Sequence, residues 1–373
     1  MAEEPLTNPL ILKKEREATD MTRHEKALAI LKSGTVIPAN PLALTAERKF
    51  DEKRQRALTR YYMDAGSGGI AVAVHTTQFE IREPKYNLFE TVIRTVVDEI
   101  ANYEKENDKV IVRVCGVCGP AEQAVSEAEL AKECGYDAVL LSPGGLNDKS
   151  EEYMIERTKA VAQVMPVIGF YLQPAVGGRA FTYSYWERIC EIDGVVAIKA
   201  APFNRYLTLD LVRAAALSSR CDDIALYTGN DDNIVIDLTT EYNFQKDGKV
   251  YSKRFVGGLL GHWSVWTKKA VELFEKLRAL HGKSEIPADV FSLANAVTDT
   301  NAAFFDTANG FKGCIAGLHE VLRRQGLLEG IWCLNPDETM SPGQMEEIDR
   351  VYRMYPDLND DDFVKSNLNK WLK

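Results

Sequence analysis

The 373-residue sequence contains no apolar run long enough to span a membrane and few of the residue types that bind metals. Its five histidines form no cluster with metal-ligand spacing, and its seven cysteines, an odd number, do not suggest a disulfide framework. Cationic residues are fewer than anionic ones: the sequence has 45 lysines and arginines and 55 aspartates and glutamates, which gives a formal net charge of −10. This balance disfavours nucleic acids and anionic membranes as the main partners and leaves small molecules or other proteins.

The N-terminal stretch also lacks the features of a signal peptide. MAEEPLTNPLILKKERE is acidic and then mixed, without a basic start and an apolar middle. We therefore expect a cytoplasmic protein whose cysteines are reduced thiols, with no metal and no cofactor. Cys115 and Cys118 in CGVC have the spacing of a redox dithiol or of half a zinc site, but small residues filling a strand end and a turn are the favoured interpretation.

Apolar, β-branched runs recur eight times along the chain, separated by segments with helical periodicity. The runs are GTVIPA, GGIAVAVH, KVIVRVCG, DAVLLS, PVIGFYLQ, GVVAIKA, DIALYTG and RFVGGLLG. They are too uniformly apolar to have a face in water, which predicts a parallel sheet covered by helices. Eight repeats favour an α/β fold with a closed (β/α)8 TIM barrel over an open doubly wound sheet, and no glycine-rich phosphate-binding fingerprint follows the first strand.

The pattern changes toward the C-terminus, where no further strands of comparable strength are found. We expect an N-terminal extension over residues 1–32, the barrel with the active site over 33–281, and a helical appendage over 282–373. The polar segment 239–254 carries an Asp-Gly turn signal and predicts either a β-hairpin or an ordinary solvated loop.

A lysine stands at the end of the sixth apolar run, in GVVAIKAAPFN. Functional side chains in such barrels lie at the carboxyl ends of strands, so Lys199 is a candidate nucleophile, although a lysine there can also simply extend its ammonium group into solvent. The fifth run ends in GFYLQP, where strand alternation places Tyr171 and Gln173 on one face. The second run ends in VHTTQFE, which adds His75 and the hydroxyls of two threonines.

These strand ends resemble motifs of the dihydrodipicolinate synthase/N-acetylneuraminate lyase family of class I aldolases. That family carries a Schiff-base lysine at the end of its sixth barrel strand, similar to Lys199. Its Tyr-x-x-Pro motif is similar to Tyr171 with Pro174, and the threonine pair after its second strand is similar to Thr76 and Thr77. The spacing from Tyr171 to Lys199 is also typical of the family, and the likeness extends over most of the chain.

The resemblance implies a function for each position. Lys199 would form an imine with the carbonyl carbon of pyruvate or another 2-oxo acid, and Tyr171 would deliver and remove the proton for loss of water. Thr76 and Thr77 would bind the substrate carboxylate, with Thr77 also part of the proton relay. The remaining substrate contacts are expected from His75, Gln173, Arg179, Gly229 and Asn230 of GNDD, and His262. A homo-oligomer, dimer or tetramer, is implied in the same way.

Three departures from the family pattern indicate a divergent member. His75 replaces a glycine before the threonines. SPGG replaces the segment in which the family has a tyrosine that each subunit contributes to the proton relay of its neighbour. Val176 replaces an arginine that binds the carboxylate of a second substrate. Arg179, three positions later, could compensate through a flexible loop. We therefore expect an aldolase-type lyase that is not an efficient dihydrodipicolinate synthase. The alternatives are a hydro-lyase using the same imine and a binding protein without turnover.

Overall fold

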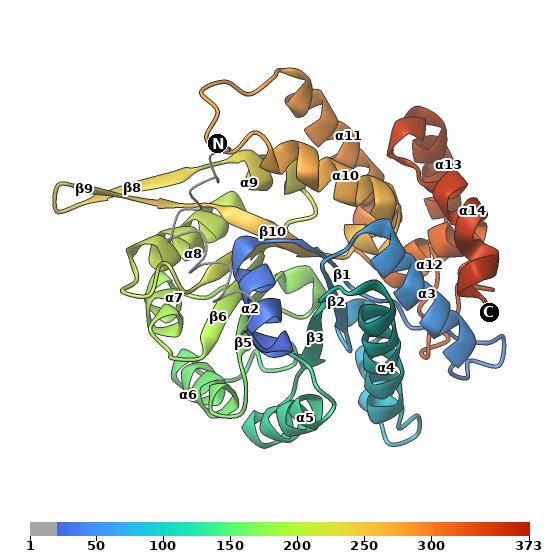
Figure 1. Cartoon of the computed structure of the whole chain (residues 1–373), viewed down its shortest axis with the longest axis horizontal. Helices are drawn as coiled ribbons and strands as arrows, with labels where there is room; N and C mark the ends of the chain where they lie inside the picture. Colours follow the sequence, from blue (N-terminus) through green and yellow to red (C-terminus); the bar gives the residue numbers. More distant parts are fainter. Residues whose placement is uncertain (1–20) are drawn as a thin grey trace, which may run out of the picture.

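Eight parallel strands form a closed barrel in the structure, a computed structural model that describes residues 21–373 (Figure 1). Their hydrogen-bonded order is β1-β10-β7-β6-β5-β4-β3-β2, and a parallel bridge between Ala39 and Ala71 connects the ends of β1 and β2. The strands are β1 (Val36–Pro38), β2 (Gly69–Val72), β3 (Val112–Val117), β4 (Ala138–Leu141), β5 (Val167–Leu172), β6 (Val195–Ala201), β7 (Ala225–Thr228) and β10 (Phe255–Leu260). The predicted (β/α)8 barrel is confirmed, and each apolar run contains one strand.

Helices follow the strands and cover the outside of the barrel (Figure 1). They are α3 (Glu52–Ala65), α4 (Phe89–Asn107), α5 (Ala121–Glu133), α6 (Glu151–Ala162), α7 (Tyr183–Cys190), α8 (Arg205–Leu217), α9 (Ile234–Thr239) and α10 (Thr267–Arg278). Several start at a polar cap, since the side chains of Asp51, Ser150, Thr182 and Asn204 accept backbone N–H bonds of the first turn. These caps fix where each loop after a strand ends.

The two faces of the barrel strands belong to two separate apolar clusters. Side chains that point inward, among them Phe170 and Leu172 of β5, form the barrel interior. Side chains that point outward, among them Tyr171 and Ile198, pack with the surrounding helices. Because successive residues of a strand alternate between faces, a shift of one position decides whether a side chain reaches the barrel mouth or the helix layer.

The chain beyond α10 is helical and packs beside the barrel (Figure 1). It contains α11 (Asp289–Phe304), α12 (Cys314–Arg324), α13 (Gln344–Met354) and α14 (Asp361–Trp371). Helix α11 packs on α9 and α13, and α14 packs on α3. The expected boundary at residue 281 falls between α10 and α11. Residues 1–20 of the expected N-terminal extension lie outside the described residues.

The polar segment before the last barrel strand is a β-hairpin that extends away from the body of the molecule (Figure 1). Strands β8 (Tyr242–Lys246) and β9 (Lys249–Lys253) pair in antiparallel register around Asp247 and Gly248. Both turn residues have positive φ, 50° and 73°, the conformation that an Asp-Gly hairpin turn requires. Of the two expectations for this segment, the hairpin is the one observed.

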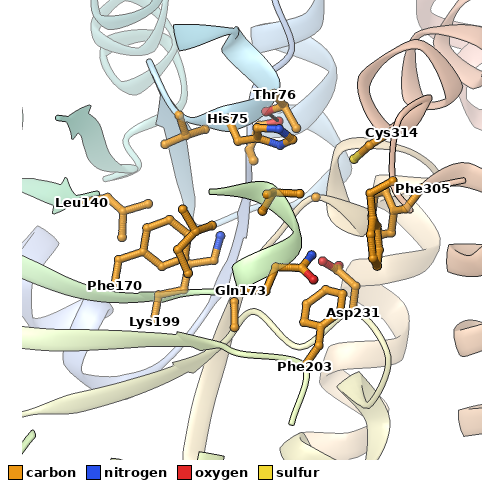
Figure 2. Close-up of a pocket in the computed structure, with 17 residues that line it drawn as sticks. His75, Thr76, Leu140, Phe170, Gln173, Lys199, Phe203, Asp231, Phe305 and Cys314 are labelled. Atoms are coloured by element: carbon orange, nitrogen blue, oxygen red, sulfur yellow. Dashed lines mark hydrogen bonds between the residues drawn. The ribbon is translucent and has the colours of Figure 1, made fainter. Parts of the chain in front are cut away.

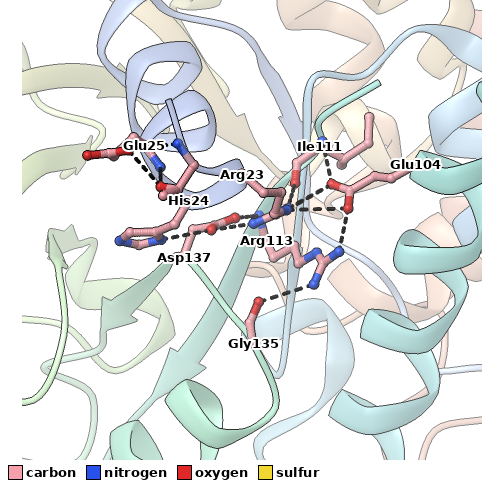
Figure 3. Close-up of polar contacts among 9 residues, drawn as sticks. Arg23, His24, Glu25, Glu104, Ile111, Arg113, Gly135 and Asp137 are labelled. Carbon is pink, nitrogen blue, oxygen red and sulfur yellow. Dashed lines mark hydrogen bonds and ion pairs between the residues drawn. The ribbon is translucent and has the colours of Figure 1, made fainter. Parts of the chain in front are cut away.

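Helix α2 (Arg23–Ser33) closes the amino-terminal end of the barrel, opposite the catalytic end of such folds. Ala27 and Leu31 of this helix are buried in the barrel-interior cluster. Arg23 at its first turn holds a network of charges, with Nη2 2.7 Å from Glu104 Oε1 and Nη1 hydrogen-bonded to Asp137 (Figure 3). Across residues 21–373, no helix combines the length and the apolar character needed to cross a bilayer.

Replacing Arg23 with methionine tests how much this network stabilises the barrel. Arg23→Met leaves the buried carboxylates of Glu104 and Asp137 with fewer partners, so we expect a loss of about 1–2 kcal/mol in unfolding free energy. Arg94→Met, which breaks exposed pairs with two glutamates, is the matched control and should cost less than about 0.5 kcal/mol. Urea unfolding followed by tryptophan fluorescence measures both, and equal losses would contradict a structural role for the network.

Candidate active site

A pocket lies at the carboxyl ends of the barrel strands, where the C-terminal region meets the barrel (Figure 2). The cavity has a volume of about 70 Å³. Its walls include His75, Thr76, Phe170, Leu172, Gln173, Lys199 and Asp231 from the barrel, and Phe305, Phe311 and Cys314 from the C-terminal region. Within the described residues, no group of three or more metal-ligating side chains is found, here or elsewhere.

Lys199 projects into this pocket from β6. In the sheet it lies beside Phe170 of β5 and Tyr227 of β7, and its Nζ is 4.5 Å from the centroid of the Phe170 ring. Burial lowers the pKa of Lys199 below its usual range, and the negative charge of Asp231 opposes this shift only partly. A larger share of the amine is therefore unprotonated near neutral pH than for a solvated lysine, which is the state that attacks a carbonyl carbon.

A glycine beside the lysine leaves space for the stem of its side chain. A Cβ atom at Gly229 would lie 2.5 Å from Lys199 Cε and 2.8 Å from the Cβ of Ala201, closer than such atoms approach. Gly229, predicted as a substrate contact, thus serves the site in another way. It lets the lysine chain run along the end of β7 into the pocket.

Asp231 is the acidic group of the pocket and was not among the predicted site residues. It follows β7, and its Oδ1 accepts a 3.2 Å hydrogen bond from the backbone N–H of His262. Burial raises the pKa of Asp231, and the Lys199 charge opposes the rise. Gln173, predicted to bind substrate, lines the same pocket (Figure 2). The GNDD motif after the seventh strand was the available sequence signal.

The loop after β2 forms a short helical turn, η1 (His75–Thr77). The hydroxyl of Thr76 donates to the carbonyl of Ala39 at 2.8 Å, and that of Thr77 donates to the carbonyl of Asn40 at 2.7 Å. Thr76 and His75, both predicted to bind substrate, line the pocket, whereas Thr77 is fully buried and outside the lining. Burial and the nearby Lys199 charge lower the pKa of His75 to about 4, so its imidazole is neutral at physiological pH.

Tyr171 does not reach the pocket, in contrast to the expectation from the Tyr-x-x-Pro pattern. The register of β5 with β6 places Phe170, and not Tyr171, beside Lys199. The phenol oxygen of Tyr171 instead accepts a 3.1 Å hydrogen bond from the Phe181 N–H, and its ring packs 4.9 Å from that of Trp186. The assignment of Tyr171 as proton donor therefore does not fit this geometry, because the side chain faces the helix layer.

Arg179 is also turned away from the pocket. Its guanidinium donates to the backbone carbonyls of Asn147 and Lys149 and lies 5.3 Å from the centroid of the Phe181 ring. Val176 lines the pocket without any compensating cation from this loop. The expectation that Arg179 binds substrate is not met, because backbone carbonyls hold its charge elsewhere.

Asn230 and His262 were predicted to bind substrate, but neither is among the residues that line the pocket. The side chain of Asn230 accepts a 3.1 Å bond from the Phe203 N–H and donates a 3.0 Å bond to Asp237. His262 is buried, and burial lowers its pKa to about 4. Its contribution is the backbone N–H that holds Asp231. Neither side chain lines the pocket, because protein partners or packing already occupy them.

The CGVC cysteines have the properties of structural residues. All seven cysteines are free thiols; Cys115 is buried within β3, and Cys118 directly follows this strand. Burial raises the pKa of Cys118 to about 11 and shifts that of Cys115 in the same direction. Thiols with raised pKa values are poor nucleophiles and poor redox centres, which fits the favoured interpretation as small residues at a strand end.

Comparison with curated proteins gives relatives of low identity. The chain is 29% identical over 206 residues to a 4-hydroxy-tetrahydrodipicolinate synthase of Moorella thermoacetica, covering 53% of this chain and 64% of that protein. It is 31% identical over 182 residues to the enzyme of the same name from Thioalkalivibrio sulfidiphilus, covering 47% and 55% of the two chains. Each match thus spans less than two thirds of the relative's length.

Solved structures share the fold over nearly the whole chain. Dihydrodipicolinate synthase from Oceanobacillus iheyensis matches with a TM-score of 0.69 at 15% identity, over 90% of this chain and all of that one. N-acetylneuraminate lyase from Fusobacterium nucleatum matches with a TM-score of 0.66 at 14% identity, over 87% and 99% of the two chains. The family model for the Dihydrodipicolinate synthetase family matches residues 32–240, more than half of the sequence. The chain therefore belongs to the Dihydrodipicolinate synthetase family.

Proposed function

We propose that this protein is a Schiff-base-forming lyase of the aldolase type that acts on pyruvate or another 2-oxo acid through Lys199. The observation that carries the proposal is a lysine amine with a lowered pKa inside a pocket at the catalytic end of a TIM barrel. The F. nucleatum N-acetylneuraminate lyase, which shares this fold, has been solved in complex with pyruvate.

The first chemical step joins the amine to the substrate. Lys199 Nζ attacks the carbonyl carbon of the 2-oxo acid, and the carbonyl oxygen, once protonated twice, leaves as water to give the iminium ion. The iminium withdraws electrons from the adjacent carbon, which then loses a proton to form an enamine. Attack of this carbon on an aldehyde makes a carbon–carbon bond, and the reverse sequence breaks one. Hydrolysis of the iminium regenerates the amine.

Asp231 is the group best suited to move these protons. Its pKa is raised toward neutral pH, so it exchanges a proton more readily near neutral pH than a solvated carboxylate, and it lines the same pocket as Lys199. The neutral imidazole of His75 and the hydroxyl oxygen of Thr76 also line the pocket and can accept hydrogen bonds from substrate or water. This assignment transfers to Asp231 the role that the sequence pattern gave to Tyr171.

Borohydride reduction in the presence of pyruvate tests the imine directly. We expect peptide mass spectrometry to find the reduced adduct on Lys199 and no adduct after Lys199→Ala. Lys253 is the internal control, because burial lowers its pKa too but its ammonium group donates to the Cys221 carbonyl outside the pocket. An adduct on Lys253 or on other lysines alone, or none with any 2-oxo acid, would falsify the proposal.

The pH dependence of imine formation tests the pairing of Lys199 with Asp231. The amine must be unprotonated, so the rate rises with pH through the pKa of Lys199. The Asp231 charge raises that pKa, and Asp231→Asn should therefore move the rising limb to lower pH, by about one unit. Loss of the proton carrier should also lower the plateau rate by about 10²- to 10⁴-fold.

Tyr171→Phe separates the two candidate proton carriers when the rate of imine formation is measured for both variants by rapid quenching with borohydride. It removes a hydroxyl that accepts the Phe181 N–H in the helix layer, so stability should fall while imine formation keeps its pH profile. If the pH profile of imine formation shifts in Tyr171→Phe and not in Asp231→Asn, Tyr171 and not Asp231 is the proton carrier.

Gly229→Ala tests whether the lysine needs the space beside β7. The new Cβ would collide with Lys199 Cε, and displacing a nucleophile by about 1 Å typically costs about 10²-fold in rate. Gly169→Ala is the matched control, because a Cβ there meets Ile198 at 3.4 Å, an ordinary contact. The comparison is the rate of imine formation in folded protein, and similar rates for both variants would show that Gly229 has no such role.

A further inference from the structure

The part of the pocket beyond the amine is apolar. Leu172, Val176, Phe203, Phe305 and Phe311 line it. In Figure 2 the rings of Phe203 and Phe305 are drawn on the same side of the pocket as Asp231. Among the described lining residues the charged side chains are those of Lys199 and Asp231, so once the uncharged enamine forms on Lys199 the remaining side-chain charge is the negative one of Asp231. A second carboxylate would find no cation there.

Two phenylalanines from separate parts of the chain meet at this apolar part of the pocket. Phe203 follows β6, and Phe311 precedes α12 in the C-terminal region. Their rings contact edge to face, with centroids 5.9 Å apart and planes at 71°. Both rings are half-buried, which leaves part of each aromatic surface available to a ligand.

The backbone holds both phenylalanines in a conformation that bulky residues avoid. Phe203 has φ of 50° and Phe311 has φ of 68°. The N–H of Phe203 donates to Asn230 Oδ1 at 3.1 Å, and that of Phe311 donates to the Asp306 carbonyl at 3.0 Å. Strain of this kind persists where surrounding contacts fix it and concentrates at ligand sites. Asn230 is thus a positioning residue for one of the two rings.

We propose that Phe203 and Phe311 are specificity-determining residues that select an aldehyde with an uncharged, aromatic or similarly apolar side chain as the second substrate, or as the product of cleavage. The inference rests on the proposed function and deepens it. In the synthetic direction, the enamine carbon formed on Lys199 bonds to the aldehyde carbon and the aldehyde oxygen takes a proton. Hydrolysis of the imine then releases a 4-hydroxy-2-oxo acid. A ring on the aldehyde would lie against the two phenylalanines.

Wild-type enzyme tests the charge requirement without any variant. With saturating pyruvate, we expect kcat/KM for benzaldehyde to exceed that for 4-carboxybenzaldehyde, which has the same ring, by at least about 100-fold. Product is measured by chromatography of the 4-hydroxy-2-oxo acid. Equal or greater activity with the carboxylated aldehyde overturns the inference.

Two variants test the phenylalanines themselves. Phe311→Ala should lower kcat/KM for benzaldehyde about 10- to 100-fold more than kcat/KM for acetaldehyde, which has no ring to contact. Phe203→Leu, a milder change that retains an apolar side chain, should alter the same ratio in the same direction. Phe291→Ala, on α11 with 56% of the residue exposed, is the matched control and should leave the ratio unchanged. Equal losses with both aldehydes contradict selection by these rings.

Imine trapping with pyruvate separates this inference from the function on which it rests. If the imine forms on Lys199 but no uncharged aldehyde reacts, the inference alone fails. If no imine forms with any 2-oxo acid, the proposed function fails as well.

Discussion

The burial of one amine in a mostly hydrocarbon pocket is the constraint on which the rest of this site depends. A protonated lysine is poorly solvated beside Phe170, and the pKa of Lys199 falls for that reason. The barrel supplies a rigid strand end and a glycine that leaves space for the lysine side chain. It also supplies the carboxylate of Asp231, whose charge limits how far burial lowers the pKa of Lys199. Asp231 is itself raised in pKa by the same surroundings. The charge of each group partly opposes the shift that burial imposes on the pKa of the other.

The sequence predicted the fold and the position of the lysine because both depend on strong, local patterns. Eight uniformly apolar runs are explained by few folds other than a parallel barrel, and a lysine that ends such a run must lie near the catalytic face. His75, Thr76 and Gln173 line the pocket as expected, since they follow strand ends whose positions were correct. These predictions required only the order of the strands along the chain.

The assignments that failed depend on register and on distant contacts, which a single sequence does not determine. The pairing of β5 with β6 shifts by one position near Val167, and this shift puts Phe170 beside Lys199 while Tyr171 faces the helices. Both faces of β5 are buried, so the sequence gives no polar alternation that would reveal the face. Arg179 was predicted to bind substrate, but its guanidinium donates to backbone carbonyls of Asn147 and Lys149. The fold brings these carbonyls near it, and the sequence around Arg179 does not show them.

The pocket wall formed by the connection between α11 and α12 divides the site between two parts of the chain. Lys199 and Asp231 lie inside residues 32–240, the segment that matches the family, whereas Phe305 and Phe311 lie beyond it. The amine and its carboxylate are held by the barrel sheet, and the outer wall is held by a helical region with its own packing. Substitutions in that connection can reshape the outer pocket while the strands that hold Lys199 remain fixed. A lineage with this architecture can therefore acquire new substrates without rebuilding its chemistry.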